Sequence, residues 1–459
     1  MKRKLNYSAA LATTAAVALL AGAAHAQAPS TCTTTTISPA HNDCVMPTAS
    51  APGGGSFPGS FLVPGTNTSF AVHGFIQVDI QHDLGPHFGD TTFGTNAVPL
   101  EGSGVSQAGL QPHATNGGTT MGVKSTRPNI ETRTPTAYGE LKTYIEFDFN
   151  QTAGTQLAGN NNLLRLRQAY GTLGPWLIGQ AFSLYADPQS YADTAAGAQD
   201  VGMMNTYNVR RPQVRYTWLA GNGLSFAGSA EEPSYPGDVV ATVGGTGSAT
   251  TVSLNGTTAY YNWPHFVGAG EWDQPWGHVK LAVAGGVAEV REQNVLAGGT
   301  TSTPNLQYGE YAIHLSGHLN TWGKDALRGG VWYNHGAADF DSWISQGGLV
   351  MTTSGTNAGA TQTQRAWAAY ANYEHFFNGQ WRANESFGYM RVVSSAPAGW
   401  SATALTGLQH TEFSNEVNVI YSPVPQTDFF FEWQHAERRV MSGANGRDDI
   451  LDAQFKFYF

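Results

Sequence analysis

Apolar and polar residues alternate with a period of two in many segments of this chain. Between residues 70 and 81 the even-numbered positions are mostly apolar and the odd-numbered positions mostly polar, and residues 140–149 and 451–459 alternate in a similar way. A helix would place these apolar side chains all round its circumference, whereas a strand places them on one side. The pattern predicts β-strands with one apolar and one polar face from about residue 69 onward.

The connections between these strands are alternately short and long. Seven short connections carry the Gly, Pro, Asn or Asp residues typical of tight turns, at 134–139, 173–175, 220–223, 274–277, 321–325, 378–379 and 422–426. Eight longer polar connections, rich in Gly and Thr, lie at about 83–119, 151–161, 185–207, 233–262, 292–304, 337–363, 392–407 and 437–448. Eight long connections that alternate with seven short ones require sixteen strands.

This rhythm is typical of an outer-membrane barrel, which has an even number of strands, short periplasmic turns and long extracellular loops. Closure pairs every backbone group internally, as a bilayer requires. A soluble sandwich or barrel is the alternative, but it would hide its apolar face inside and would need no such rhythm. We therefore predict an all-β fold, a 16-stranded antiparallel transmembrane β-barrel over residues 68–459. Aromatic residues near strand ends suit its interfacial girdles: Trp176, Trp218, Trp276, Trp322 and Trp381.

The N-terminal residues predict export from the cytoplasm. Three basic residues at positions 2–4 precede an apolar stretch, and Ala24-His25-Ala26 has the small-x-small pattern of a signal-peptide cleavage site. The stretch is short for a transmembrane anchor, which needs about 20 apolar residues. We predict a signal peptide at 1–26, a low-complexity segment at 27–67 and localisation in the bacterial outer membrane.

Two cysteines, Cys32 and Cys44, lie in the low-complexity segment. Outside the cytoplasm they can form a disulfide. With His41 between them they would make only an incomplete metal site. The histidines and aspartates of the first long loop are too irregularly spaced to predict a metal site either.

Composition and motifs exclude several classes of function. Only 12% of the residues are charged, and 23 Lys and Arg against 33 Asp and Glu give a net charge of −10. This balance lacks the basic footprint of a nucleic-acid-binding protein. The sequence contains no G-x-S-x-G, H-E-x-x-H or P-loop motif. We therefore expect no enzymatic activity and no cofactor.

Several motifs recur in order along the barrel region, at 133–149, 164–171 (Leu-Arg-Leu-Arg-Gln-Ala-Tyr-Gly), 178–180, 187–188, 209–216 (Val-Arg-Arg-Pro-Gln-Val-Arg-Tyr), 418–425 and 437–439. With them the chain resembles the DcaP-like outer-membrane porins of Gram-negative bacteria. The resemblance implies a homotrimer, in contact with lipid and lipopolysaccharide, that passes small anionic solutes such as dicarboxylates. It also implies that the third outer loop, about residues 185–207, folds into the pore. Residues 27–67 depart from the family because they have no coiled-coil heptads, and the third loop departs after Pro188.

Charged residues in the predicted strands should face the lumen, since a charge that faces mid-bilayer lipid costs roughly 2–4 kcal/mol. The turn at 134–139 is expected to place Arg133 opposite Glu140. It is likewise expected to place Glu131 opposite Lys142. Six cations are predicted to line the pore: Arg133, Lys142, Arg165, Arg167, Arg211 and Arg215.

The third loop supplies opposite charge through Asp187, Asp193 and Asp200. Arginines that face an acidic loop would create a transverse field across a narrow aqueous passage. At ~6 Å in water each arginine would attract a solute carboxylate by about 0.7 kcal/mol. The alternative is that the arginines pair with these aspartates, or with Glu146 and Asp148, and only brace the loop.

The predicted function is passive diffusion of small hydrophilic solutes, mainly organic anions, through an arginine-lined constriction. The alternative is a structural or adhesion protein whose plugged barrel only anchors the outer loops, and discrete single-channel currents would distinguish the two. An energy-coupled transporter would need about 22 strands and a folded plug. Residues 27–67 are too few to form that plug.

Overall fold

The computed structural model describes residues 54–86, 98–100, 116–151, 163–195, 209–233, 239–242, 250–251, 259–260, 262–290, 306–338, 340, 348–352, 360–396 and 399–459. The predicted signal peptide, Cys32, Cys44 and Asp200 lie outside these residues. Within them no helix is both long and apolar enough to cross a membrane.

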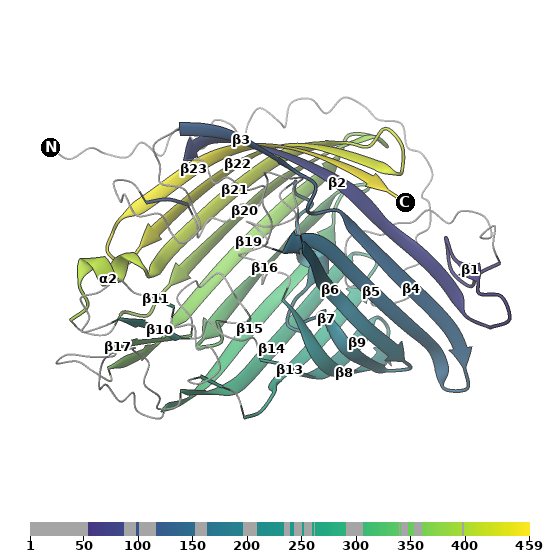
Figure 1. The fold of residues 1–459 in the computed structure, drawn as a ribbon, viewed down its shortest axis with the longest axis horizontal. Helices are drawn as coiled ribbons and strands as arrows, with labels where there is room; N and C mark the ends of the chain where they lie inside the picture. The colour runs from purple at the N-terminus through teal and green to yellow at the C-terminus, as the bar shows by residue number, and fades with distance from the viewer. Residues whose placement is uncertain are drawn as a thin grey trace.

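Sixteen antiparallel strands form a closed barrel, as the sequence predicts (Figure 1). The first is β2 (Ser69–Pro86), and the second consists of β3 (Asn116–Gly122) and β4 (Arg127–Thr136). The remaining strands are β5 (Gly139–Gln151), β6 (Leu163–Leu173), β7 (Trp176–Phe182), β8 (Arg210–Gly221), β9 (Leu224–Glu231), β13 (His265–Gln274), β14 (Gly277–Val290), β15 (Leu306–Asn320), β16 (Ala326–His335), β19 (Arg365–Phe376), β20 (Trp381–Val392), β21 (Gln409–Tyr421), β22 (Thr427–Val440) and β23 (Asn445–Tyr458).

The barrel closes where its first strand meets its last. β2 pairs with β4 on one side and with β23 on the other. Gly74 and Phe459 exchange two backbone hydrogen bonds, with N···O distances of 3.2 and 3.0 Å, at the end of this seam. No strand edge of the barrel is therefore left open along the seam.

The two faces of each strand are inverted relative to a soluble protein. On β5, Ile145 is 43% exposed and its neighbour Glu146 only 3%. On β8, Val214 is 44% exposed and Arg215 only 7%. Apolar side chains thus cover the outside, where lipid solvates them, and polar side chains face one another inside. The alternation predicted from the sequence is confirmed.

All seven predicted short turns join strands in the structure, but two details are different. The eighth long loop, predicted at 437–448, is a turn of residues 441–444. Charged residues such as Arg438 and Arg439 resemble a loop in sequence, yet they alternate between the two faces of a strand.

The predicted register of the first turn is also wrong by two residues. Arg133 was expected opposite Glu140 but lies opposite Lys142.

Small elements outside the barrel wall gather among the long connections. β10 (Val239–Thr242), β11 (Thr250–Thr251), β17 (Leu349–Thr352) and β18 (Thr361–Thr363) form a four-stranded sheet. Trp400 lies just before α2 (Ala402–Thr406) and Leu408 just after it, and both pack with Val350 of β17. The Trp400 indole N–H donates a hydrogen bond to the Thr352 hydroxyl at 2.8 Å. At the opposite end β1 (Phe61–Leu62) pairs with β2 (Figure 1). β12 (Ala259–Tyr260) extends the pairing of β14.

Candidate pore and its inner loop

The chain leaves the barrel wall after Phe182, the last residue of β7. The next residues turn inward through a short 3-10 turn, η3 (Pro188–Ser190). Asp187 caps this turn, because its carboxylate accepts the backbone N–H of Gln189 at 3.2 Å. Pro188 suits the first position, where a missing N–H costs nothing. We call residues 183–195 the inner loop.

The inner loop contacts strands on the far side of the barrel one after another. Hydrogen bonds join it to β14 (Lys280 Nζ to Ala186 O, 2.8 Å), to β19 (Tyr370 with Ser190, 2.7 Å) and to β22 (Ala195 N to Glu432, 2.8 Å). These strands follow each other around the wall. The inner loop therefore runs along the inside of the barrel from β7 to β22.

Asp187 anchors the start of this path. Its carboxylate lies 3.4 Å from His278 Nε2 of β14 and accepts the Ser316 hydroxyl of β15 at 2.7 Å. Burial raises the pKa of the Asp187 carboxyl, but the hydrogen bond and charge of His278, with Lys280 and Ser316, outweigh it. The net pKa lies well below its ordinary value. Asp187 is thus held as a carboxylate.

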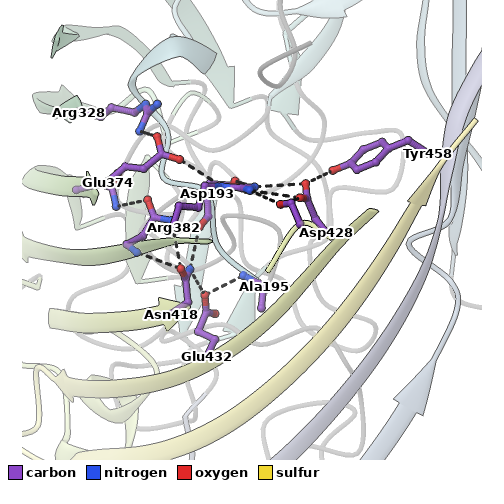
Figure 2. Close-up of polar contacts among 12 residues, drawn as sticks. Asp193, Ala195, Arg328, Glu374, Arg382, Asn418, Asp428, Glu432 and Tyr458 are labelled. Atoms are coloured by element: carbon purple, nitrogen blue, oxygen red, sulfur yellow. Dashed lines mark hydrogen bonds and ion pairs between the residues drawn. The ribbon is translucent and has the colours of Figure 1, made fainter. Parts of the chain in front are cut away.

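Asp193 anchors the far end of the path to β20. Figure 2 shows Arg382 at the centre of this contact, with Asp193 on the inner loop and Asp428 on β22 as its partners. Arg382 Nη2 lies 2.8 Å from Asp193 Oδ2, and Nη1 lies 3.3 Å from Asp428 Oδ1. Tyr458 of β23 donates to the second oxygen of Asp428 at 3.0 Å. One guanidinium therefore joins the loop to the wall.

Two further contacts extend this network along the wall. Arg382 Nε lies 3.5 Å from Glu374, which in turn pairs with Arg328 at 2.7 Å. Asn418 donates to the Asp193 carbonyl at 2.8 Å and to Glu432 at 2.9 Å (Figure 2). The wall therefore binds the inner loop both through the Asp193 side chain and through the Asp193 backbone carbonyl.

The arginines of β6 pair with carboxylates of the adjacent strand β5. Arg165 binds Asp148 through two hydrogen bonds of 2.9 and 2.7 Å, and Arg167 binds the same carboxylate at 2.5 Å. Arg167 also lies 3.3 Å from Glu146. Of the alternative partners considered from the sequence, the structure thus brings Glu146 and Asp148 to these arginines.

The arginines of β8 hold the base of the inner loop. Arg215 donates to the Phe182 carbonyl at 2.5 Å, where the chain leaves the wall, and to Gln213 at 2.9 Å. Arg211 lies 3.0 Å from His265 of β13 and stacks over the Phe340 ring at 4.2 Å. Both arginines therefore connect strand β8 to the base of the inner loop and its surroundings.

The cations nearest the first turn form a cluster with Glu131. Arg133 and Lys142 lie 2.6 and 3.1 Å from its two oxygens, and Arg133 is 3.7 Å from Glu140. The expected pairs therefore form, but diagonally, because the strands are shifted by two residues. Arg133 also covers the Phe57 ring at 4.6 Å.

The six predicted cations fall into two groups by exposure. The side chains of Arg165, Arg133 and Lys142 are 35, 27 and 18% exposed. By contrast, Arg167, Arg211 and Arg215 are at most 7% exposed. Only the first group presents a guanidinium or ammonium surface that a passing solute can contact. The second group acts within the wall.

Several charged residues of the site were missed from the sequence, namely Lys280, Arg328, Glu374, Arg382 and Asp428. Strand phase alone could have found Arg382, since it follows the outward-facing Trp381 directly after a predicted turn. The sequence names Asp193 as a loop residue, but its pairing with Arg382 could not have been found in this way. That contact depends on the path of the inner loop.

One group of described residues has the side-chain types that bind metals. Oxygen and nitrogen atoms of Glu271, Asp273 and His278 lie within 4.8 Å of one another. His278 Nδ1 already contacts Asp273 at 2.8 Å, and its other nitrogen faces Asp187. His278 therefore links Asp273 of the barrel wall to Asp187 of the inner loop through ionic contacts, which accounts for the proximity of these side chains.

Comparison with known proteins places this architecture in a family. A family model described as a porin subfamily matches residues 58–447. The crystal structure of the outer membrane channel DcaP of Acinetobacter baumannii matches with a TM-score of 0.65 and 15% identity, over 87% of this chain and 99% of that chain. No curated protein matches the chain in sequence.

Two other solved structures are more distant. OmpT of Vibrio cholerae has a TM-score of 0.48 and 9% identity, over 87% of this chain and 100% of its own. The anion-selective porin of Comamonas acidovorans has a TM-score of 0.48 and 8% identity, over 85% and 100%. The expected likeness to DcaP is confirmed in the fold, and the family match covers most of the sequence. The chain therefore belongs to the porin subfamily and is an outer-membrane channel protein.

Proposed function

We propose that this porin passes small hydrophilic solutes by passive diffusion and favours small organic anions such as dicarboxylates. The observation that carries the proposal is the exposure of Arg165, Arg133 and Lys142 on the inward face, at 35, 27 and 18%. These three cations lie along one wall, on β4, β5 and β6, so a carboxylate can pass from one to the next. Each adds about 0.7 kcal/mol of attraction at ~6 Å.

We also propose that the inner loop narrows the pore opposite this wall. Its contacts with β14, β19 and β22 support this, because they keep residues 183–195 inside the barrel. A narrow passage brings the solute within a Debye length of about 8 Å of the wall cations. Arg167, Arg211 and Arg215 then support the wall and the loop base.

The test is a reversal potential in a salt gradient across a planar bilayer. In the double variant Arg133→Gln and Arg165→Gln, two exposed charges are lost, and each loss removes about 0.7 kcal/mol of attraction at its own position along the pore. The ratio of anion to cation permeability should then fall roughly threefold. The variant Arg167→Gln with Arg215→Gln is the matched comparison, since it also removes two charges but from buried sites. It should cost more thermal stability and change the permeability ratio less.

Two outcomes would overturn parts of this proposal. An unchanged reversal potential in the Arg133 and Arg165 variant would reject anion preference. Absence of discrete current steps in the unmodified protein would reject diffusion and favour a barrel that only anchors its outer loops. We further propose a homotrimer, which cross-linking in native membranes would test by a three-subunit product.

A further inference from the structure

Glu271, Asp273 and His278 lie beside the hairpin that joins β13 to β14, and we call these three residues the hairpin site. The register places Asp273 directly opposite His278, and Glu271 is two residues before Asp273 on the same face of β13. Only Pro275 and Trp276 separate the two strands. Because so short a turn fixes the register, the backbone itself holds the three side chains on one inward patch.

The two carboxylates converge on one nitrogen of the imidazole. His278 Nδ1 lies 2.8 Å from Asp273 Oδ1 and 3.6 Å from Glu271 Oε1. Histidine nitrogens and carboxylate oxygens bind Zn²⁺ at about 2.0–2.2 Å, so the ligand atoms of a tetrahedral zinc ion lie roughly 3.4 Å apart. Small movements of these side chains therefore admit an ion between the three ligand atoms.

The other nitrogen of the imidazole faces a carboxylate of the inner loop. His278 Nε2 lies 3.4 Å from Asp187, and the His278 side chain is only 1% exposed. A histidine that binds a metal almost always donates its second ring N–H to a group such as a carboxylate, which fixes the tautomer and the ring orientation. The inner loop also supplies Gln189, which donates to Glu271 Oε1 at 3.5 Å. The outer contacts that a metal site needs are therefore already present.

The charges around the hairpin site favour a divalent cation. Lys280 lies opposite Glu271 and acts electrostatically on it and on Asp187. When the carboxylates of Asp187, Glu271 and Asp273 are ionised and His278 is neutral, this one lysine leaves two negative charges uncompensated. A divalent cation would neutralise both. The Asp273 side chain is 51% exposed, so an ion can enter from water.

A second imidazole lies beside the hairpin site. His318 of β15 is opposite His278, and the two rings stack with their centroids 5.7 Å apart and an angle of 17° between their planes. The Nδ1 atom of His318 is buried and has no hydrogen-bond partner among the residues that the structure describes. A water molecule bound to a metal ion would supply this nitrogen with a donor.

Histidine–carboxylate contacts at two other places in the described strands lack this convergence. His435 has two carboxylate neighbours, but Asp449 lies 2.9 Å from Nδ1 and Glu437 lies 3.4 Å from Nε2. Carboxylates on opposite nitrogens do not face one common point. His375 contacts the single carboxylate of Asp325, at 2.7 Å. Of the described residues, only those of the hairpin site bring three ligand atoms within 4.8 Å of one another.

We propose that the hairpin site binds one divalent transition-metal ion, best matched by Zn²⁺, through Glu271, Asp273 and Nδ1 of His278. Imidazole suits Zn²⁺, Cu²⁺ and Ni²⁺, whereas Ca²⁺ and Mg²⁺ prefer about six or more oxygen ligands. Because His278 also contacts Asp187, the bound ion strengthens the link between the hairpin and the inner loop. The site lies on β13 and β14, away from the exposed cations of β4, β5 and β6.

The test is calorimetric titration of the purified full-length protein with Zn²⁺, in detergent, without an affinity tag and after treatment with a chelator. One ion should bind per subunit and raise the thermal midpoint, and excess Ca²⁺ or Mg²⁺ should not compete. Asp273→Asn and Glu271→Gln each remove one ligand charge and keep the shape of the side chain. Each should weaken Zn²⁺ binding by at least about 100-fold, since the loss of an outer contact alone costs roughly 10–100-fold.

Two control variants should bind Zn²⁺ as the unmodified protein does. Glu437→Gln makes the same kind of change beside His435, where the carboxylates do not converge. Cys32→Ser combined with Cys44→Ser removes the thiols of the low-complexity segment, because thiolates are also zinc ligands.

Three results would overturn the proposal. They are no saturable Zn²⁺ binding by the unmodified protein, unchanged affinity in the Asp273 and Glu271 variants, and loss of binding in either control. Discrete single-channel currents in each variant verify that its barrel has folded. None of these variants alters Arg133, Lys142 or Arg165, so a failure of zinc binding leaves the solute proposal untouched, and the reverse also holds.

Discussion

Arg382 of β20 and Asp193 of the inner loop, 189 residues apart in sequence, form an ion pair of 2.8 Å inside the barrel. The same guanidinium contacts Asp428 and Glu374, so three carboxylates surround one cation. Arg382 is therefore one of the residues that tie the inner loop to the barrel wall.

Replacing Arg382 with Gln should loosen the inner loop. The change removes this cation from the half-buried carboxylates of Asp193 and Asp428, and breaking such a pair costs on the order of 3 kcal/mol. We expect noisier single-channel currents and a lower thermal midpoint in detergent. Arg391→Gln is the control, because it removes the same charge from the outward face of the same strand. Equal current noise in both variants would contradict this role of Arg382.

Acid should release the inner loop only at unusually low pH. The pKa of Asp187 is depressed in the folded protein, so its contribution to stability is complete above the unfolded pKa of about 4 and is lost as pH falls through the folded value. Open-channel noise should therefore stay constant from pH 7 to about pH 4 and rise only in stronger acid. Asp187→Asn should show the added noise already at neutral pH. A rise between pH 6 and 5 in the unmodified protein would contradict this assignment.

Deleting Phe459 should impair assembly of the barrel. Its backbone exchanges hydrogen bonds with Gly74 where the first and last strands meet, and its loss leaves both groups of Gly74 unpaired. The amount of heat-resistant folded protein in the outer membrane measures the effect. Deletion of residues 29–53 is the comparison, since it spares Phe57, which the Arg133 guanidinium covers, and Ser56, whose N–H donates to Ser69 at the start of β2. Equal levels for both deletions would be evidence against the seam argument.

Gly179→Ala should destabilise the barrel, whereas Gly268→Ala should not. Gly179 on β7 has φ of +130°, and an added Cβ would lie 2.7 Å from Tyr170 Cα and closer still to the Ala169 carbonyl. At Gly268 on β13 an added Cβ meets nothing within 4 Å. We expect a loss of about 1–3 kcal/mol at Gly179 and less than about 0.5 kcal/mol at Gly268. Urea unfolding in lipid vesicles measures both.

The sequence by itself determined the strands, their faces and the short turns. Successive side chains of a strand point to opposite faces, so alternation such as that of Ile145 and Glu146 can be read from neighbouring residues alone. Because lipid lies outside the barrel and water inside, the same alternation is expected in every strand. Turn residues act over only a few positions. Local rules therefore sufficed to count sixteen strands and to direct the arginines inward.

Only the tertiary structure decided which charges meet. Asp193 finds Arg382, and Asp148 finds Arg165 and Arg167, because barrel closure and the path of the inner loop bring distant segments together. Tertiary structure also separated the exposed cations from the buried ones, a distinction that the alternating pattern does not contain. The register of β4 and β5 at Arg133 was also decided by tertiary structure. The turn residues allow more than one register, and packing against the adjacent strands determines which one forms.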